Sequence, residues 1–459
     1  MDKVRYSITV YVEGNKCNLN CSYCYIKNAR WDDEPEKIKL DYDIEQMIKA
    51  FDTKRIGGIA EITVIGSAET LIVDSIIPFV HGLLRQGHVV TVVTNATLEK
   101  RIKELVNIEK KYLKRLIVKA SLHYLELVRL NLLDVYFSNI KYVIESGASC
   151  FPFIIISNDY LPYLDEISQK CMENLEIKPQ CSPCNEVVDV DSILYDSKFN
   201  PEISEKLYEQ IKKGYDTRIF DAIVENKKFD SQEHFCYAGM WSFGVDFATG
   251  KMSKCHNLPI DKNFYEDIEH FDLCEPVACS CGIESCCLQY NFFSEGLLPD
   301  YDNGNLLGDM LYTEGYVNRE VCEMLNVRFD KIYGRLSDKE EAKISLKEKN
   351  KQIKRVQQQK NRNPFFKEII YKQRKLGKYI YIYGIGGLYK QYKDTIGFEV
   401  EGYLDSFKAG ECFEGKIVKS INEIDLNSDI FIVIAAVEKR DEIERLLEKK
   451  GLVRGKGYI

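Results

Sequence analysis

The chain has 459 residues, a formal net charge of −8 and 45% hydrophobic residues, which is the composition of an ordinary globular protein. This length predicts about two to four domains with ample core. The negative charge argues against a nucleic-acid-binding surface. No apolar run approaches the ~20 residues that span a bilayer, and the N-terminus has no signal-peptide core. We therefore expect a cytoplasmic protein that binds neither nucleic acid nor membrane, and its sixteen cysteines are expected to be metal ligands rather than disulfides.

Strand-like and helix-like segments alternate from residue 5 to about 185. Strands are expected at 6–13, 61–67, 89–95, 116–122, 150–157 and 176–181, and helices between them at 41–52, 71–86, 97–113, 125–146 and 159–172. Several of the strands are almost continuously apolar, as in a parallel sheet that is covered on both faces. The sequence thus predicts an α/β fold with a partial (βα)6 barrel over residues 1–185.

Three cysteines follow the first predicted strand, with the spacing Cys17-x3-Cys21-x2-Cys24. The carboxyl ends of strands are where ligands bind in α/β sheets and barrels. Thiolates on one short run suit an iron–sulfur cluster, whereas structural zinc usually takes four ligands in two separated pairs. Three protein ligands on a four-iron cluster would leave one iron open to a small molecule. The alternative is three buried or disulfide-linked cysteines.

This spacing, with the aromatic Tyr23 before the third cysteine, resembles the signature of radical S-adenosylmethionine (SAM) enzymes. The resemblance implies a [4Fe-4S] cluster on Cys17, Cys21 and Cys24, with SAM on the fourth iron. It also implies that an electron from the cluster releases a 5′-deoxyadenosyl radical, which abstracts hydrogen from a substrate. An external electron donor, such as a flavodoxin or ferredoxin, is then expected.

Later strand ends supply candidates for SAM contacts. The family commonly has Gly-Gly-Glu after the second strand, and the resemblance implies that its backbone binds the SAM amino group. The corresponding residues here are Gly66, Ser67, Ala68 and Glu69. The alternative is a plain turn with Glu69 near a helix N-terminus. Asn95 is a further SAM candidate or a backbone-bonding turn residue. Ser121 is the candidate for the SAM ribose, and His123 replaces the usual aspartate beside it.

A second pair of cysteines, Cys181 and Cys184, follows the sixth predicted strand. Two interpretations stay open from the sequence. The pair either ligates a cluster or acts near the substrate, or it is semi-buried in a Pro-bounded turn.

A linker with helices is expected at 186–233, and a cysteine-rich domain at 234–330. The pattern Cys236…Gly250-x4-Cys255, with a predicted hairpin around Gly250, resembles the SPASM/twitch auxiliary-cluster domain. The downstream spacing departs from that family, and Cys322 is either a late ligand or a buried helix cysteine. The resemblance implies one or two auxiliary [4Fe-4S] clusters, with zinc as the rival metal. The candidate ligands are Cys236, Cys255, Cys274, Cys279, Cys281, Cys286 and Cys287.

A basic helical linker is expected at 331–363, followed by a small Rossmann-like domain at 364–459 with strands at 379–383, 399–404 and 430–435. A glycine-rich turn and a later acidic residue suit nucleotide binding, with phosphates at a helix N-terminus. The residues concerned are Gly384, Gly386, Gly387 and Asp405. A purely structural or docking role is the alternative.

The predicted reaction is reductive SAM cleavage followed by hydrogen abstraction. The first hypothesis is an oxidoreductase or epimerase that acts on a sugar, polyol or nucleotide-linked metabolite. The second is a SPASM-type maturase that modifies a peptide or protein. In either case the C-terminal domain could recruit the enzyme to an assembly.

Overall fold

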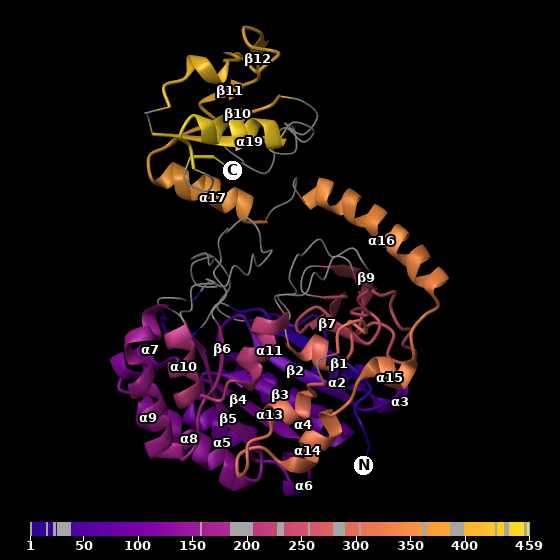
Figure 1. The fold of residues 1–459 in the computed structure, drawn as a ribbon. Helices are drawn as coiled ribbons and strands as arrows, with labels where there is room; N and C mark the ends of the chain where they lie inside the picture. The colour runs from indigo at the N-terminus through magenta and orange to yellow at the C-terminus, as the bar shows by residue number, and fades with distance from the viewer. Residues whose placement is uncertain are drawn as a thin grey trace. The chain divides into compact units, whose positions relative to one another are not determined.

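The computed structural model describes residues 2–14, 17–21, 24, 38–156, 158–183, 205–226, 234–255, 258–278, 290–302, 304–359, 364–385, 399–426, 429–435, 440–453 and 457–458. The chain forms two compact units (Figure 1). The first comprises residues 1–186 with 197–348, and the second comprises 187–196 with 349–459. No helix in the described ranges is long and apolar enough to cross a membrane.

A nine-stranded sheet forms the centre of the first unit, with the strand order β6-β5-β4-β3-β2-β1-β7-β8-β9. Adjacent strands from β6 to β7 run parallel, and β8 and β9 add antiparallel neighbours. The strands are β1 (Tyr6–Val12), β2 (Ala60–Gly66), β3 (Val89–Thr94), β4 (Leu116–Ser121), β5 (Ser149–Ile156), β6 (Gln180–Pro183), β7 (Ser242–Asp246), β8 (Lys251–Ser253) and β9 (Pro259–Asn263). The predicted mixed α/β fold with a parallel sheet is confirmed.

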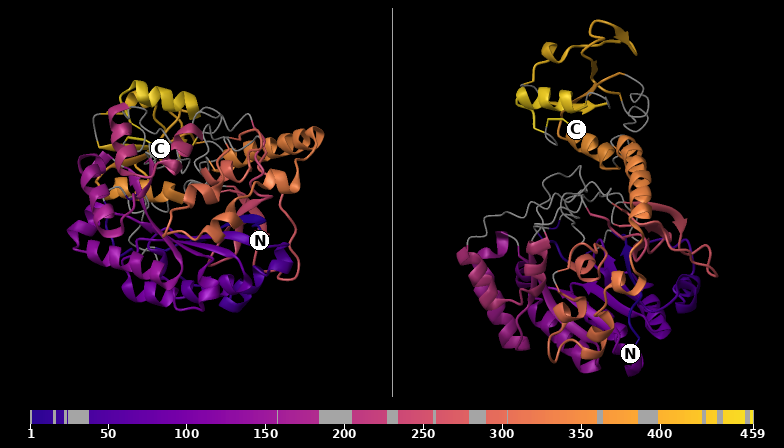
Figure 2. Two further views of the ribbon diagram at one scale, coloured as in Figure 1. Left: turned by 60° about the horizontal axis from the view of Figure 1, so that its bottom comes forward. Right: turned by 45° about the vertical axis from the view of Figure 1, so that its right-hand side comes forward.

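One face of this sheet, the helix face, packs against α2 (Ile44–Ala50), α4 (Ile76–Gln86), α5 (Glu99–Leu105), α8 (Leu133–Ser146) and α9 (Leu164–Leu175). Figures 1 and 2 show these indigo-to-magenta helices along one side of the strands. Val118 and Ala120 of β4 belong to this core. Short helices complete the layer: α3 (Thr53–Ile56), α6 (Lys110–Leu113), α7 (Tyr124–Arg129) and α10 (Glu205–Gly214).

Two helices predicted as continuous are each divided in the structure. The 97–113 segment forms α5 and α6, and the 125–146 segment forms α7 and α8. Asn131 lies between α7 and α8 with a φ of 55°, in the left-handed region that ends a helix. Apolar periodicity continued through this break, so the sequence pattern concealed it.

The opposite face of the sheet, the inner face, carries Ile117, Phe151 and Phe153. It packs against α11 (Arg218–Asn226), α12 (Tyr290–Ser294), α13 (Leu307–Leu311), α14 (Arg319–Leu325) and α15 (Phe329–Tyr333). Successive side chains of a strand alternate between the two faces. Glu61 of β2 and Lys119 of β4 therefore belong to the inner face, since their strand neighbours lie in the helix-face core.

The second unit has a three-stranded parallel sheet with the order β11-β10-β14. Its strands are β10 (Tyr379–Tyr383), β11 (Gly402–Leu404) and β14 (Ile430–Ile434). One face packs against α17 (Pro364–Lys375) and the other against α19 (Arg440–Lys449), and a small hairpin joins β12 (Cys412–Phe413) to β13 (Lys416–Ile417). The long helix α16 (Asp338–Gln359) begins in the first unit and ends in the second.

Candidate functional site

The loop that carries Cys17, Cys21 and Cys24 leaves the carboxyl end of β1 and is fixed first to the turn after β2. The Ser67 hydroxyl accepts a hydrogen bond from the Gly14 N–H and donates one to the Gly14 carbonyl, both at 2.9 Å. The Ser67 N–H donates to the Val12 carbonyl at 3.0 Å. One side chain thus satisfies both backbone groups of Gly14, which holds the start of the cysteine loop against β2.

A second anchor joins the middle of the cysteine loop to the turn after β3. Asn18 donates to the Thr97 hydroxyl at 2.7 Å and accepts from the Asn95 amide at 2.8 Å. Asn95 also accepts from the Thr97 hydroxyl at 2.6 Å. These three polar side chains form a closed ring of hydrogen bonds that fixes the Asn95 side chain to the cysteine loop. Asn95 therefore has a structural role at its position beside the predicted SAM site.

A third anchor comes from α7. The Asn20 N–H donates to the Glu126 carboxylate at 2.7 Å, and Arg129 donates to the same carboxylate at 2.7 Å. Glu126 is buried, and a buried carboxylate needs such donors. The segment between Cys17 and Cys21 is therefore held from β3 and α7 together.

The three cysteines differ in exposure. Cys17 is exposed, Cys24 is half-buried and Cys21 is buried, and the Cys24 N–H donates to the Cys21 carbonyl at 3.3 Å. Within the described residues no three metal-binding side chains lie close enough to hold a metal ion. The donor chemistry of three thiols on one anchored loop nevertheless fits an iron–sulfur cluster. Tyr23 lies outside the described residues.

The carboxylate of Glu69 accepts all its described hydrogen bonds from neighbouring residues of the protein. It accepts hydrogen bonds from the Thr94 hydroxyl at 2.6 Å, the Asn95 N–H at 2.7 Å and the Leu71 N–H at 3.0 Å. Burial raises the pKa of Glu69, while these three donors oppose the shift. The side chain thus ties the turn after β2 to the turn after β3. This leaves the backbone of Gly66, Ala68 and their neighbours as the predicted SAM contact.

Replacing Glu69 by alanine would leave three buried donors without their acceptor. We expect Glu69→Ala to lower the free energy of unfolding by about 3 kcal/mol and Glu69→Gln, which keeps one oxygen, by about 1 kcal/mol. Urea denaturation and calorimetric SAM titration measure both effects. Glu145→Ala, at an exposed site on α8, is the matched control. Equal stability of the alanine and glutamine variants would contradict this account.

Ser121 ends β4, and Lys119 precedes it by two residues on the same inner face. The Lys119 ammonium lies 3.5 Å from the ring centroid of Phe153, which pairs with Ser121 in the β4–β5 register. The ammonium therefore reaches towards the level of Ser121. Desolvation lowers the pKa of Lys119 to about 8. Lys119 was not predicted as a site residue. A lysine at an inward position of an otherwise apolar strand could have indicated it.

His123 follows β4 and precedes α7. Desolvation lowers its pKa to about 4, and the charge of Glu126 opposes this shift. The imidazole is therefore neutral at pH 7. It adds no positive charge beside the site where the sulfonium of SAM is expected.

Residues 11–156, which run from the end of β1 through β5 and include the cysteine loop, match the family described as the radical SAM superfamily. This segment is a radical SAM domain. No curated protein matches the sequence.

Similar solved structures include Streptococcus suis SuiB bound to S-adenosylmethionine, at 14% identity and a TM-score of 0.38, covering 58% of this chain and 62% of SuiB. Native anSMEcpe with bound AdoMet has 15% identity and a TM-score of 0.38, over 57% of this chain and 79% of that one. BtrN in complex with AdoMet and 2-DOIA has 11% identity and a TM-score of 0.24, over 73% and 92%. The chain thus spans less than two thirds of the SuiB structure it matches.

Beyond the radical SAM domain, the cysteine-rich segments join the same compact unit through β7 and the segment 274–278. Cys236 and Ala278 exchange backbone hydrogen bonds at 3.4 and 3.0 Å. Cys236 and Cys255 are half-buried against the inner-face core, whereas Cys274 is buried in the helix-face core. The other candidate ligands, Cys279, Cys281, Cys286 and Cys287, lie outside the described residues. The auxiliary ligand set stays a prediction.

Cys181 and Cys322, the two further cysteines considered as ligands, both have buried side chains. Cys181 lies in the helix-face core of the unit that holds the radical SAM domain, and burial raises its pKa well above the usual range. This position favours the interpretation of Cys181 as a buried residue. Cys184 lies outside the described residues. Cys322 is buried on α14, where desolvation raises its pKa to about 12.

In the second unit, the turn after β10 lies beside the end of β11. Gly384 has a φ of 96°, and its N–H donates to the Leu404 carbonyl at 2.7 Å. Asp405 accepts from the Ile385 N–H at 3.3 Å and from the Phe407 N–H at 2.9 Å. The Asp405 carboxylate thus already binds backbone donors of both turns. Gly386 and Gly387 lie outside the described residues, and nucleotide binding stays a prediction.

Proposed function

We propose that the chain is a radical SAM enzyme that reductively cleaves SAM and abstracts hydrogen from a sugar, polyol or nucleotide-linked metabolite, with oxidation or epimerisation as the outcome. The observation that carries the proposal is the cysteine loop, which Ser67, Asn95 and Glu126 anchor within a radical SAM domain. Anchoring from three elements is what a site needs to hold a cofactor in one geometry.

Cys17, Cys21 and Cys24 would hold a [4Fe-4S] cluster, which supplies the electron for SAM cleavage when bound. The backbone from Gly66 to Glu69 would orient the amino group of SAM, and Ser121 its ribose. An external flavodoxin or ferredoxin would reduce the cluster. One or two auxiliary clusters on the cysteine-rich segments would exchange an electron with the substrate radical.

The inner face supports a small polar substrate. Lys119 and Ser121 present an ammonium and a hydroxyl there, next to the predicted SAM site. An ammonium with restricted hydration binds an anionic group strongly, because a low local dielectric strengthens charge–charge attraction. The phosphate of a nucleotide-linked metabolite has this chemistry.

A peptide or protein substrate is the second candidate. The cysteine-rich segments favour it, because they resemble a SPASM/twitch domain and peptide modification is the commonest role of proteins with that domain. A docking role of the second unit is compatible with either substrate class.

The test is anaerobically reconstituted full-length protein incubated with SAM and dithionite, with 5′-deoxyadenosine measured by liquid chromatography. We expect 5′-deoxyadenosine to form, and its yield to rise with nucleotide sugars or phosphorylated polyols rather than with peptides. No 5′-deoxyadenosine would reject radical SAM chemistry, and stimulation by peptides alone would favour the maturase. Because Lys119 is proposed to bind the anionic group of the substrate, Lys119→Met should lose the stimulation while it keeps the unstimulated rate.

A further inference from the structure

Four aromatic side chains of the first unit form a continuous chain from the inner-face core to the surface. The rings of Tyr237 and Trp241 stack with their centroids 3.9 Å apart and an interplanar angle of 5°. Trp241 stacks on Tyr333 at 5.9 Å and 21°, and Tyr333 contacts Tyr6 at 6.0 Å. Trp241 is 1% exposed, whereas Tyr333 is 38% exposed. One indole ring thus joins the fully buried Tyr237 to an exposed tyrosine.

The three stacked rings all belong to side chains that can lose one electron. Phenol and indole rings are oxidised more easily than aliphatic side chains, so tyrosine and tryptophan can each carry a radical. Electron exchange falls steeply with separation, and rings in stacked contact therefore exchange electrons readily. The order Tyr237–Trp241–Tyr333 offers an electron path between the core and the surface, and this path needs no metal ion.

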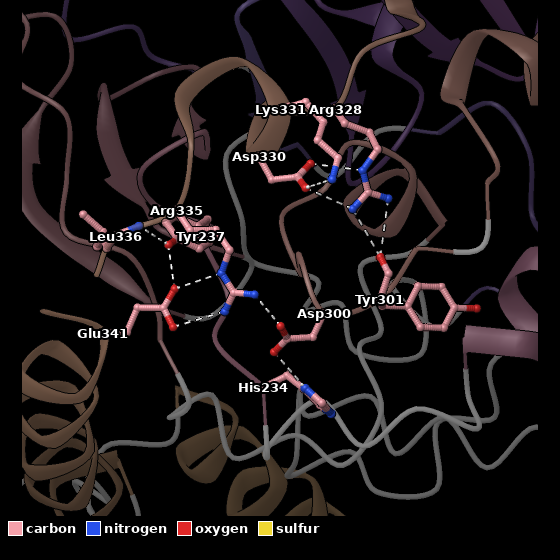
Figure 3. Close-up of polar contacts among 10 residues, drawn as sticks. All are labelled: His234, Tyr237, Asp300, Tyr301, Arg328, Asp330, Lys331, Arg335, Leu336 and Glu341. Carbon is pink, nitrogen blue, oxygen red and sulfur yellow. Dashed lines mark hydrogen bonds and ion pairs between the residues drawn. The ribbon is translucent and has the colours of Figure 1, made fainter. Parts of the chain in front are cut away.

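The two tyrosines at the ends of this path differ in what their hydroxyl groups contact. The Tyr237 hydroxyl donates to the carboxylate of Glu341, on α16, at 2.8 Å. Figure 3 shows this contact, with Arg335 donating to both Glu341 oxygens at 3.3 Å. The Tyr333 hydroxyl donates to the Arg5 carbonyl at 2.9 Å. A carboxylate can take up a proton, whereas a backbone carbonyl is far too weak a base. Tyr237 is therefore the end of the path with a proton acceptor in place.

Tyr237 must release its proton if it is to lose an electron. Burial and the hydrogen bond to Glu341 raise the pKa of Tyr237 well above its usual range, against the Leu336 N–H, which donates to the same hydroxyl at 2.7 Å. The phenol is therefore protonated in the resting protein. Removal of one electron makes a phenol strongly acidic, and Glu341 lies within hydrogen-bond distance to accept the proton. The product is a neutral radical, so no new positive charge is buried in the core.

We propose that Tyr237 is a one-electron redox site that exchanges electrons with the surface through Trp241 and Tyr333. A one-electron oxidant at the surface takes an electron from Tyr333, which is refilled from Trp241. Tyr237 then gives its electron to Trp241 and its hydroxyl proton to Glu341. An external one-electron reductant reverses the sequence, because an electron returns to Tyr237 and Glu341 gives back the proton. The site holds one oxidising equivalent and requires neither SAM nor an iron–sulfur cluster, so it goes beyond the proposed function.

The test is photo-oxidation of the full-length protein by a ruthenium tris(bipyridine) complex with a sacrificial electron acceptor, which supplies a one-electron oxidant in solution. Radicals on exposed tyrosines decay quickly by coupling with one another, so the persistent electron paramagnetic resonance signal is compared. We expect a persistent neutral tyrosyl radical in the wild type and loss of most of it in Tyr237→Phe. Trp241→Phe keeps a ring in place but interrupts the path, so it should also lose most of the persistent signal.

Tyr124→Phe is the matched control. The Tyr124 hydroxyl also donates to a carboxylate, that of Glu166, at 2.6 Å, and Tyr124 is 2% exposed. Within the described ranges its ring stacks on no other aromatic side chain. Tyr124→Phe should therefore keep the persistent signal. An equal loss in Tyr124→Phe and Tyr237→Phe would show that buried tyrosines are oxidised regardless of the stacked path, and it would overturn the inference.

Glu341→Gln tests the proton acceptor separately and keeps the inference testable if Tyr237→Phe does not fold. Glutamine keeps an oxygen beside the Tyr237 hydroxyl but cannot take up its proton. We expect the tyrosyl radical to form about 100-fold more slowly in this variant, as measured by time-resolved absorption after the flash. An unchanged rate in Glu341→Gln, or an unchanged persistent signal in Tyr237→Phe, would mean that the aromatic chain serves packing alone.

Discussion

Replacement of Cys17, Cys21 and Cys24 together by alanine is expected to abolish 5′-deoxyadenosine formation and to remove about four irons from each chain, because one four-iron cluster loses all its protein ligands. The measurements are 5′-deoxyadenosine yield and iron and sulfide content after identical reconstitution. About four residual irons would indicate one auxiliary cluster and about eight would indicate two.

The matched control is Cys412→Ala, which removes an exposed cysteine of the second unit. This variant should keep the full iron content and the full yield of 5′-deoxyadenosine. An unchanged iron content in the triple variant would contradict the assignment of the cysteine loop. Bound zinc in place of residual iron would identify the auxiliary site as a zinc site.

The second large effect is a dependence of stability on pH, and it comes from two carboxyl groups on the inner face of the sheet. Glu61 is 5% exposed and Glu295 is fully buried. Burial raises the pKa of Glu61 to about 7, against hydrogen bonds from Thr63 at 2.7 Å and Ser7 at 3.3 Å. Burial holds the pKa of Glu295 well above its usual range, and the charge of Glu61 adds to this effect. Both groups are therefore costly to ionise in the folded protein.

The direction of the pH effect follows from proton binding. The folded state holds a proton on Glu61 between its ordinary pKa of about 4.5 and about 7, where the unfolded state has released it. The stabilising contribution is complete below pH ~4.5 and is lost as the pH rises through 7. The difference amounts to about 3 kcal/mol, at 1.36 kcal/mol per pKa unit.

Glu61→Gln should therefore raise the free energy of unfolding relative to wild type by about 3 kcal/mol at pH 8, and by much less at pH 5. Urea denaturation at the two pH values measures this difference. Glu99→Gln, at an exposed site on α5, should show no such dependence on pH. A gain for Glu61→Gln that is the same at pH 5 and pH 8 would show that Glu61 ionises freely in the folded state.

Local sequence patterns predicted more of the fold than of the candidate site. Continuous apolar runs such as residues 89–93 marked the parallel strands, and Gly250, with a φ of 71°, marked the β7–β8 hairpin. The spacing of the three cysteines identified their loop because all its ligands lie within one short segment. Each of these signals is complete within a few neighbouring residues.

The anchors of the cysteine loop were not predictable in the same way. Ser67 lies 53 residues from Gly14, and Glu126 lies 106 residues from Asn20. Such contacts depend on which strands are neighbours and on their register, and neither is encoded locally. Glu69 was predicted in the SAM-binding segment, with a plain turn near a helix N-terminus as the alternative, and its links to Thr94 and Asn95 needed the positions of two different turns.

The pairing of β7 with β1 limits where this chain can be divided into fragments or joined to parts of related chains. β1 has β2 on one side and β7 on the other, and the Phe247 N–H continues the ladder to the Tyr11 carbonyl at 2.8 Å. A fragment that ended after β6 would turn β1 into an unprotected edge strand, whose open backbone groups invite aggregation. The strand that delivers the first three cysteines therefore depends on a sequence segment more than two hundred residues later. Exchange of the cysteine-rich region between related chains should keep β7 with the sheet, so that the join falls after this strand.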